Sequence, residues 1–433
     1  MENQSAPKSP FRGLDYLKIT ILGFALGGLA NAMHSIILPL RIQDFVEDSR
    51  KSTFLGLITF AGLLIAMLVQ PIAGSVSDRS TSRWGRRRPF IFIGITAAII
   101  LLAGIGSVGS FAALFIIWGF TQTSLNIAQG PFQAFIPDLV PSKKRGLASG
   151  VKNLLEIAGG VVLIRVVSIF MSNYSGNSSG IGLWSSLGVL GLVLLVTLVI
   201  TLVTVREKPG NGLTAASGAA ASFPDIFHIN IKAHPGFLLF LVSRLLFIMA
   251  LTTLQTFALY YFQDVVGIAD PAKITADLIT AVGIAMLIIV IPAGRISDKI
   301  GRKSILIACG FLAAAGIAVI FYFPVYHLIL FAGSLIGLAA GAFLSTNWAL
   351  ATDLIPQEEA GRYMGITNLA SAGGGALARL IGPVIDFFNG LGTGTGYSVM
   401  LGSCFAYFII GSILIWRIQT TRHSGTTAGL ITD

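Results

Sequence analysis

The sequence predicts an all-α membrane protein in which twelve spanning helices form two related six-helix bundles. Three observations support this fold class: a very apolar composition, twelve apolar runs of spanning length, and two copies of one charged hinge. The chain has 433 residues, of which 54% are hydrophobic and 11% charged, and its mean hydropathy is +0.82. Soluble domains carry about 25% charged residues. A lipid-facing surface therefore accounts for this composition better than a water-facing one.

The twelve apolar runs give the order of the helices. A spanning helix needs about 20 mostly apolar residues, and runs of that kind cover 16–40, 54–76, 90–108, 111–136, 147–171, 182–205, 236–262, 274–297, 304–323, 328–354, 363–388 and 397–417. The small residues of G-N-G-L-T-A-A-S-G-A-A-A-S, after the sixth run, predict a flexible linker. We therefore expect an N-terminal bundle over 1–205, a cytoplasmic linker over 206–235 and a C-terminal bundle over 236–433.

The basic residues predict the orientation. With a cytoplasmic N-terminus, the tails and the loops on that side carry 20 Lys and Arg, and the opposite loops carry four. Membrane proteins retain Lys and Arg in their cytoplasmic loops. We expect a multi-pass protein of the cell membrane with both termini in the cytoplasm. This distribution explains the net charge of +10 without a nucleic-acid partner.

Two charged hinges separate apolar runs at corresponding places. The first reads G-S-V-S-D-R-S-T-S-R-W-G-R-R-R-P over Gly74–Pro89, and a shorter copy follows 220 positions later, from Gly294 to Lys303. A second pair of motifs, Asp138-Leu-Val-Pro and Asp353-Leu-Ile-Pro, lies at an offset of 215. Similar spacing of two independent motifs predicts two six-helix repeats.

Polar residues avoid every third predicted helix. The spanning cores of the third, sixth, ninth and twelfth helices contain no Asp, Glu, Lys, Arg, His, Asn or Gln. Polar side chains at membrane depth usually face the bundle interior or a water-filled cavity. These four helices are therefore predicted to face lipid, and the other eight to surround a polar path typical of a transporter.

The paired Gly-x-x-x-Asp-Arg/Lys…Gly-Arg-Arg/Lys hinges resemble those of the major facilitator superfamily. The longer hinge and the run Gln129-Gly-Pro-Phe-Gln133-Ala, which ends at Asp138-Leu139, are similar to plant sucrose transporters and their animal relatives, near the glycoside–pentoside–hexuronide cation symporters. The resemblance implies a cavity lined by helices 1, 4, 7 and 10. Two departures argue against sucrose itself and against a melibiose-type sodium site: Gln133 stands where the sucrose transporters have an arginine, and helix 2 contains no carboxylate.

The hinges and the acids near them are predicted to form a cytoplasmic gate. Hinge glycines allow a neighbouring helix to approach, hinge aspartates can accept from the N-terminus of a facing helix, and arginines can bridge acids in forked geometry. We expect these contacts to form when the cytoplasmic side is shut and to break when it opens; alternatively, the arginines only enforce topology. The candidates are Gly74, Asp78, Arg79, Gly85, Arg86, Arg87, Arg88, Asp138, Arg145, Gly294, Asp298, Lys299, Gly301, Arg302, Asp353 and Arg362.

Amides, basic groups and one indole on the cavity helices are the substrate-binding candidates. Amides hydrogen-bond sugar hydroxyls, and an indole packs against the apolar face of a pyranose. The alternative is hydrogen bonding between helices. For His34 a proton site and a neutral structural role both stay open. The candidates are Asn31, His34, Asn126, Gln129, Gln133, Arg244, Gln255, Asn347 and Trp348.

Glu156 is the candidate proton carrier. It lies near the middle of the fifth helix, where burial favours protonation of a carboxylate. Lys152 is one turn earlier, so a fixed salt bridge is the alternative, and Arg165 is on the opposite side of the helix. Arg244 and Arg379 are each either substrate-facing or structurally paired, and we expect Asp386, seven residues after Arg379, to share its face.

Together these features predict a secondary transporter of a small sugar-like solute that is coupled to H⁺ and needs no cofactor. Its runner-up is an exporter of drugs or other amphiphiles, which a cavity rich in Phe would favour, and a third hypothesis is a non-transporting receptor. No phosphate-binding loop, catalytic constellation or metal-ligand cluster of His and Cys is visible. We expect a monomer without enzymatic activity.

Overall fold

The computed structural model describes residues 13–172, 174, 180–207, 235–354 and 360–418, except for the side chains of 360–362. Within these ranges the chain is helical and contains no strand. Eleven of the described helices are long and apolar enough to cross a membrane. The all-α membrane fold predicted from composition and apolar runs is confirmed.

The N-terminal half contributes six spans. The first is divided into α1 (Gly13–Thr20), α2 (Leu22–Ala32), a π-helical turn (Met33–Ile37) and α3 (Leu38–Gln43). The others are α4 (Lys51–Asp78), α5 (Arg88–Ser107), α6 (Phe111–Leu139), α7 (Arg145–Met171) and α8 (Ile181–Thr204). Short 3-10 turns at Asp48–Arg50 and Ser142–Lys144 precede α4 and α7.

The C-terminal half repeats this order. Its helices are α10 (Pro235–Asp264), α11 (Pro271–Ile300), α12 (Arg302–Tyr322), α13 (Tyr326–Leu354), α14 (Ala360–Arg379), α15 (Gly382–Leu391) and α16 (Thr395–Arg417). The predicted linker lies outside the described residues, apart from its ends at Arg206, Glu207 and Pro235.

The predicted eleventh span, 363–388, is two helices rather than one. The break between α14 and α15 precedes Pro383, which has no N–H to donate to the carbonyl of Arg379 one turn earlier. Close packing also fixes this point, because a Cβ on Gly56 of α4 would lie only 2.3 Å from the Arg379 carbonyl oxygen. The end of α14 is therefore held against the opposite half.

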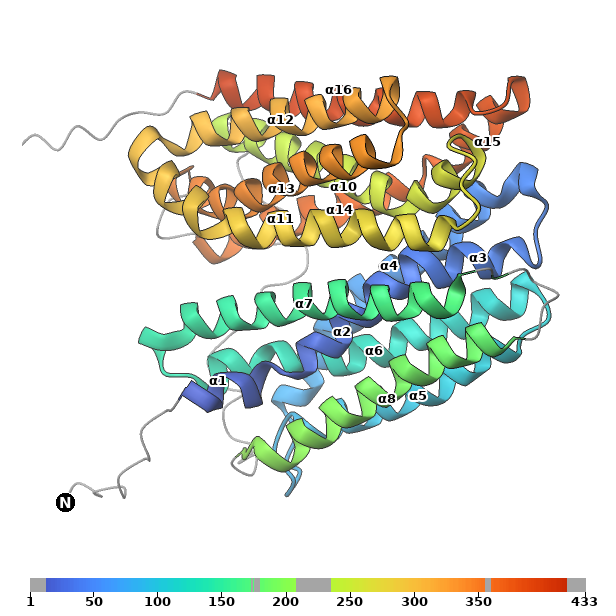
Figure 1. Cartoon of the computed structure of the whole chain (residues 1–433). Coiled ribbons are helices and arrows are strands. Elements are labelled where there is room, and N and C mark those ends of the chain that lie inside the picture. Colours follow the sequence, from blue (N-terminus) through green and yellow to red (C-terminus); the bar gives the residue numbers. More distant parts are fainter. Residues whose placement is uncertain (1–12, 173, 175–179, 208–234, 355–359, 419–433) are drawn as a thin grey trace, which may run out of the picture.

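The two halves lie side by side and diverge toward one end (Figure 1). We call the end with residues 79–87 and Gly301 the hinge face, and the opposite end, with residues 44–50 and 265–270, the far face. The helices α5 and α8 lie at one outer edge and α12 and α16 at the other. As predicted for lipid-facing supports, these four helices expose large apolar side chains such as Ile100, Val203, Phe311 and Trp416.

Small residues let α2 pack tightly against α7. A Cβ on Gly27 would lie 2.3 Å from the Glu156 carbonyl oxygen, and a Cβ on Gly159 would lie 1.9 Å from that of Phe24. Glycine is therefore required at both positions, as in other closely packed membrane helices. This packing places Asn31 on α2 and Glu156 on α7 beside the same space between the halves.

Candidate functional site

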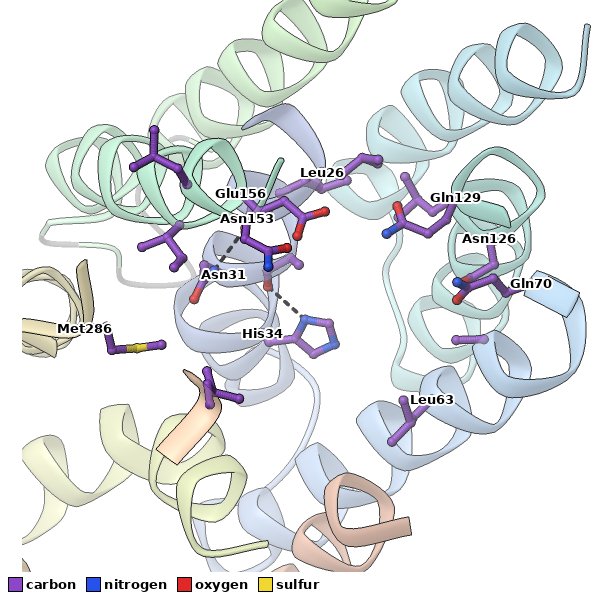
Figure 2. Close-up of a pocket in the computed structure, with 18 of the residues that line it drawn as sticks. Leu26, Asn31, His34, Leu63, Gln70, Asn126, Gln129, Asn153, Glu156 and Met286 are labelled. Atoms are coloured by element: carbon purple, nitrogen blue, oxygen red, sulfur yellow. Dashed lines mark hydrogen bonds between the residues drawn. The ribbon is translucent and has the colours of Figure 1, made fainter. Parts of the chain in front are cut away.

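A cavity of about 980 Å³ lies between the two halves and extends toward the hinge face. The N-terminal half lines it with residues of α2, the π-helical turn, α4, α6 and α7, and the C-terminal half with residues of α11, α13 and α14. Its polar lining residues are Asn31, His34, Gln70, Gln122, Asn126, Gln129, Asn153, Glu156, Ser345 and Arg379. Figure 2 shows Gln70, Asn126 and Gln129 across the cavity from His34, Asn153 and Glu156. The polar surface thus belongs almost entirely to the N-terminal half.

Four predicted substrate residues meet in this cavity: Asn31, His34, Asn126 and Gln129. His34 donates from Nδ1 to the Ala30 carbonyl at 2.8 Å and packs edge-on against Trp118, with ring centroids 5.3 Å apart. Asn126 donates from Nδ2 to the Gln122 carbonyl at 2.8 Å. These intrahelical contacts leave the amide oxygen of Asn126 and Nε2 of His34 as groups that a polyol can use.

A smaller cavity of about 330 Å³ adjoins the first and is mostly apolar. Asn31 lines both cavities, and its Oδ1 accepts from Nε2 of Gln255 at 2.9 Å across the halves. Gln133 lines neither cavity, but its Oε1 accepts from Nε2 of Gln70 at 3.0 Å. The predicted Gln255 and Gln133 are thus one hydrogen bond away from residues that line the larger cavity.

Arg244, Asn347 and Trp348 lie away from both cavities, in the paired arrangement that was the alternative to substrate contact. They line neither cavity and instead form a packed cluster inside the C-terminal half. The guanidinium of Arg244 donates to Oδ1 of Asn347 and, at 2.7 Å, to Oγ of Ser371, and it lies 4.6 Å from the ring of Trp348. These contacts hold α10, α13 and α14 together, so the three side chains bind one another rather than line either cavity.

Among the described residues that line the larger cavity, Glu156 and Arg379 have charged side chains. Glu156 is paired with Lys152, whose Nζ lies 2.7 Å from Oε1. This is the salt bridge that was the alternative to a proton-carrying role. Arg379 lies on the opposite wall, at the C-terminus of α14. Asp386 does not share its face, because the helix breaks between them and the Asp386 carboxylate binds the start of α4 instead.

Several lining residues were not among the sequence candidates: Gln70, Gln122, Asn153 and Ser345. Each lies on a helix that the polar census had assigned to the polar path, so the signal was present in the sequence. Periodicity alone did not show which amides face inward, because that depends on how each helix is rotated in the bundle.

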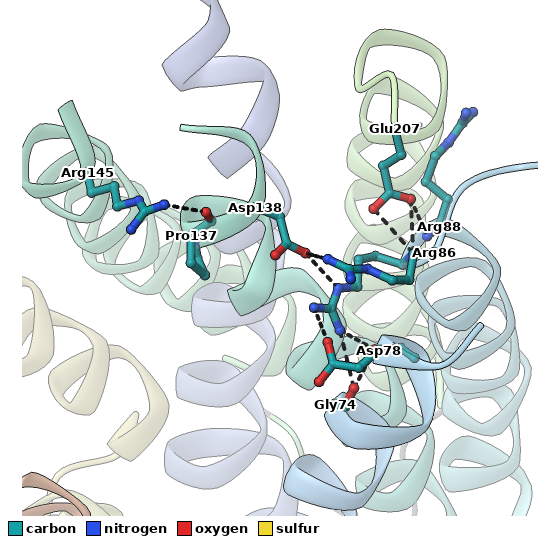
Figure 3. Close-up of polar contacts among 10 residues, drawn as sticks. Gly74, Asp78, Arg86, Arg88, Pro137, Asp138, Arg145 and Glu207 are labelled. Carbon is teal, nitrogen blue, oxygen red and sulfur yellow. Dashed lines mark hydrogen bonds and ion pairs between the residues drawn. The ribbon is translucent and has the colours of Figure 1, made fainter. Parts of the chain in front are cut away.

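The first hinge is a compact ionic cluster centred on Arg87. Figure 3 shows Asp78, Arg86 and Asp138 of this cluster. The buried guanidinium of Arg87 pairs with Asp78 and, at 2.9 Å, with Asp138, and donates to Oγ of Ser77 at 2.6 Å. Arg86 adds a second pair with Asp138 at 2.8 Å. Gly85 has φ of +108°, a backbone conformation that favours glycine. The cluster ties the ends of α4, α5 and α6 together within one half.

The second hinge repeats the arrangement with fewer residues. Arg302 pairs with Asp353 at 2.5 Å and lies 3.9 Å from Asp298, and Gly301 has φ of +102°. Ser297 donates to the carbonyl of Gly294 at 2.7 Å, as Ser77 does to that of Gly74. The repeat seen in the sequence is thus matched in three dimensions.

Glu207 joins the first hinge from the end of α8. Its carboxylate accepts from the backbone N–H groups of Arg87 at 3.0 Å and of Arg88 at 3.1 Å, at the start of α5. Burial raises the pKa of Glu207, while these two donors act in the opposite direction. A Cβ on Gly85 would lie 2.3 Å from the same carboxylate. Sequence reasoning missed this residue because its partners are backbone groups.

The two hinge glycines differ in their surroundings. A Cβ on Gly74 or on Gly294 would have no neighbouring atom within 4 Å, but a Cβ on Gly130 of α6 would lie 3.1 Å from the Gly74 backbone nitrogen, so α6 approaches α4 closely at the first hinge. The arginine–acid pairs lie within each half and are present in this arrangement, in which the cavity extends toward the hinge face.

The remaining gate candidates differ in their contacts. Arg88 donates to the carbonyl of Leu202 on α8, and Arg145 donates to that of Pro137 at 2.7 Å. Arg79 and Lys299 are exposed and form no ion pair with the described residues. The side chain of Arg362 lies outside the described residues.

Polar contacts between the halves gather toward the far face. Lys51, at the start of α4, pairs with Asp264 at 2.7 Å, and Tyr397 donates to the same carboxylate at 2.6 Å. Gln43 donates to Gln263 at 2.7 Å. These contacts join the last turn of the first span and the start of α4 to the C-terminal end of α10.

Asp386 provides the N-terminal cap of α4 from the opposite half. It accepts from the backbone N–H groups of Ser52 at 3.3 Å and Thr53 at 2.6 Å, whereas the side chain of Arg50 makes no capping bond. Deeper along the same interface, Arg165 of α7 pairs with the buried Asp277 of α11. The halves are thus closed at the far face and apart at the hinge face.

Comparisons with known proteins fit this geometry. The sequence model of the Major Facilitator Superfamily matches residues 20–379. "Sucrose transport protein SUC3" of Arabidopsis thaliana is 31% identical over 131 residues, covering 25% of this chain and 22% of that protein. "Proton-associated sugar transporter A" of Rattus norvegicus is 31% identical over 192 residues, covering 40% of this chain and 25% of that protein. The matches thus span about a quarter of the length of these relatives.

The fold itself has a solved counterpart. The crystal structure of a D-xylose-proton symporter superposes with a TM-score of 0.73 over 95% of this chain and 99% of the other, at 17% identity. At that identity the likeness concerns the fold.

Proposed function

We propose that this chain, which belongs to the Major Facilitator Superfamily, moves a small sugar-like solute across a membrane by alternating access. It is an integral, multi-pass membrane transporter and not an enzyme. The observation that carries the proposal is the amide-rich cavity between two halves that touch at one end and diverge at the other. Relatives named as sugar transporters support the choice of solute.

The lining of the larger cavity favours a polyol over an amphiphile. Amide side chains from four helices face it, and the buried indole of Trp118 packs against His34. A cavity rich in Phe would favour the exporter alternative, but no described lining residue of this cavity is Phe. Hydroxyl groups of a sugar can exchange hydrogen bonds with the amides while the sugar ring packs against apolar side chains.

The ion pairs divide into two kinds with different roles. Pairs at the hinges, such as Arg87–Asp138, lie within one half and keep that half rigid. Pairs at the far face, such as Lys51–Asp264, join the halves and must break for that face to open. Rocking between two such arrangements around a central site is the movement expected of this architecture.

Asp78 and Asp298 are proposed to close the hinge face. Their side chains are 56% and 70% exposed, so both carboxylates can accept from the opposite half when the halves approach. Asp78→Asn should then slow uptake while the protein still reaches the membrane, because the hinge-closed state loses a charge-assisted contact. If Asp78→Asn takes up solute as fast as the unmodified protein, Asp78 does not help to close the hinge face.

Proton coupling through Glu156 is part of the proposal. Its carboxylate lines the cavity, is 26% exposed, and has Lys152 as its partner one turn away. A proton that enters the cavity can protonate this carboxylate and release Lys152 from the ion pair. Binding of H⁺ would then change the polar lining of the cavity. We further propose cytoplasmic termini at the hinge face, bundles over 1–205 and 236–433, and a monomer.

Uptake by the full chain in proteoliposomes tests the function. A panel of monosaccharides and disaccharides would be offered with and without an imposed pH gradient. Saturable uptake of at least one sugar, increased by the gradient, is expected. Uptake of apolar cations instead would favour the exporter, and binding without uptake of any panel member would favour a receptor.

A further inference from the structure

The charge balance of the larger cavity is uneven. Among its described lining residues, Glu156 and Arg379 carry the full charges. Glu156 is neutralised by Lys152, with 2.7 Å between Nζ and Oε1. Arg379 has no counterpart of this kind: the described residues place no carboxylate within ion-pair distance of its guanidinium. The cavity therefore holds about one uncompensated positive charge.

The hydrogen bonds of Arg379 do not remove this charge. Its Nη1 donates to the Gly375 carbonyl, at the C-terminal end of α14. A helix C-terminus carries roughly half a negative charge, which balances part of the guanidinium. Nε is buried without a partner, and Nη2 makes no hydrogen bond with a described residue. Ionisable groups at membrane depth are costly unless they are paired or serve a ligand.

The position of Arg379 suits a ligand that spans the cavity. The amides of Gln70, Asn126 and Gln129 belong to the N-terminal half, whereas Arg379 belongs to the C-terminal half. The break after Arg379 and the contact of its carbonyl with Gly56 fix the backbone at that point. Arg244, on α10 of the same half, is occupied by Asn347 and Ser371. Arg379 is thus the cation that remains available in the cavity.

We infer that Arg379 selects a solute with a negatively charged group, and that the solute is a sugar-like acid bearing one carboxylate. The hydroxyl groups bind the amides of the N-terminal half, and the carboxylate accepts from the Nη groups of Arg379. This inference rests on the proposed transport function and adds the chemical class of the solute. Binding of one solute to both halves also gives it a means to draw them together.

The test compares two solutes that differ at one carbon. Methyl glucopyranoside and its uronate, in which a carboxylate replaces the primary alcohol, would be offered to the full chain in proteoliposomes. The uronate should be taken up with the higher kcat/KM. In Arg379→Gln the uptake of the uronate should fall about 10- to 100-fold, as for a lost hydrogen bond to a charged group. Uptake of the neutral glycoside should change less than threefold.

Two further variants separate charge recognition from folding. Arg379→Lys keeps a positive charge and should keep part of the preference for the uronate. Arg417→Gln removes the same charge from an exposed position at the end of α16 and should behave as the unmodified protein. Binding to purified protein, read as a ligand-induced rise in Tm, should show the same order and does not depend on transport.

The outcomes are distinguishable. Preference for the uronate that is lost in Arg379→Gln supports the inference. Equal or better uptake of the neutral glycoside, or an equal loss of both solutes in Arg379→Gln, overturns it and leaves the transport function in place. Failure of the whole sugar panel, acids included, overturns the proposed function and this inference with it.

Discussion

Replacing Asp386 by alanine should open the far face. In the structure this carboxylate caps α4 from the opposite half through the N–H groups of Ser52 and Thr53. The cap exists only while the halves touch at that face, so the substitution destabilises one conformation more than the other. The equilibrium between conformations should shift accordingly.

The size of the shift follows from the cap. Loss of an N-cap acceptor costs about 0.5–2 kcal/mol, which corresponds to about a 2- to 30-fold rise in the ratio of far-open to far-closed protein. The bond from Thr53, at 2.6 Å to a charged acceptor, places the expected value in the upper part of that range.

Distance measurements by electron paramagnetic resonance provide the assay. Spin labels would be attached at Gly109 and Val325, which are exposed on far-face loops of opposite halves. The buried Cys309 and Cys404 would first be replaced by alanine. In Asp386→Ala the ratio of the longer-distance population to the shorter-distance population should rise by the factor given above.

Asp48→Ala is the matched control. Asp48 is an acid at the same face, 3.5 Å from Lys51, but its side chain is 82% exposed. Such exposed pairs contribute little, so its distance distribution should stay that of the unmodified protein. A distribution in Asp386→Ala that is the same as in Asp48→Ala would refute the reasoning.

Three further predictions concern the hinge and the coupling site. Arg87→Ala should lower Tm, because it removes the ion pairs of a buried guanidinium with Asp78 and Asp138, at a cost of about 1.5–3 kcal/mol for hydrogen bonds to charged groups, whereas exposed Arg79→Ala should not. Glu207→Gln should lower Tm less than Glu207→Ala: burial raises the pKa of Glu207, so the stability that its protonated form provides is lost as pH rises through that pKa, whereas a neutral amide keeps an acceptor oxygen at every pH. Glu156→Gln should abolish accumulation driven by a pH gradient but keep solute exchange; accumulation equal to that of the unmodified protein would exclude proton coupling at this residue.

Much of the fold could be predicted because lipid imposes strong constraints on sequence. Apolar runs of spanning length gave the helices, and the absence of polar residues from every third run identified α5, α8, α12 and α16 as peripheral. The split of the eleventh span was missed. Pro383 indicated it, but Pro is also tolerated inside membrane helices such as α4, which contains Pro71.

The site could be predicted only in part, because inward rotation is a tertiary property. Asn126 and Gln129 were identified by their amides, yet Asn347, with the same chemistry, is fully buried against Arg244. Likewise Arg244 and Arg379 have the same side chain, and only the packing of α10, α13 and α14 distinguishes the paired one from the available one. Which face is open is a property of the conformation and is not encoded in any single motif.

Locking the far face tests the account most directly. Gln43 and Gln263, which hydrogen-bond across the halves at 2.7 Å, would be replaced by cysteines in the background without Cys309 and Cys404. A short, reducible bis-methanethiosulfonate reagent would then join them. The account predicts that the cross-linked protein still binds solute but transports none, and that a reductant restores transport. Undiminished transport by fully cross-linked protein would contradict it.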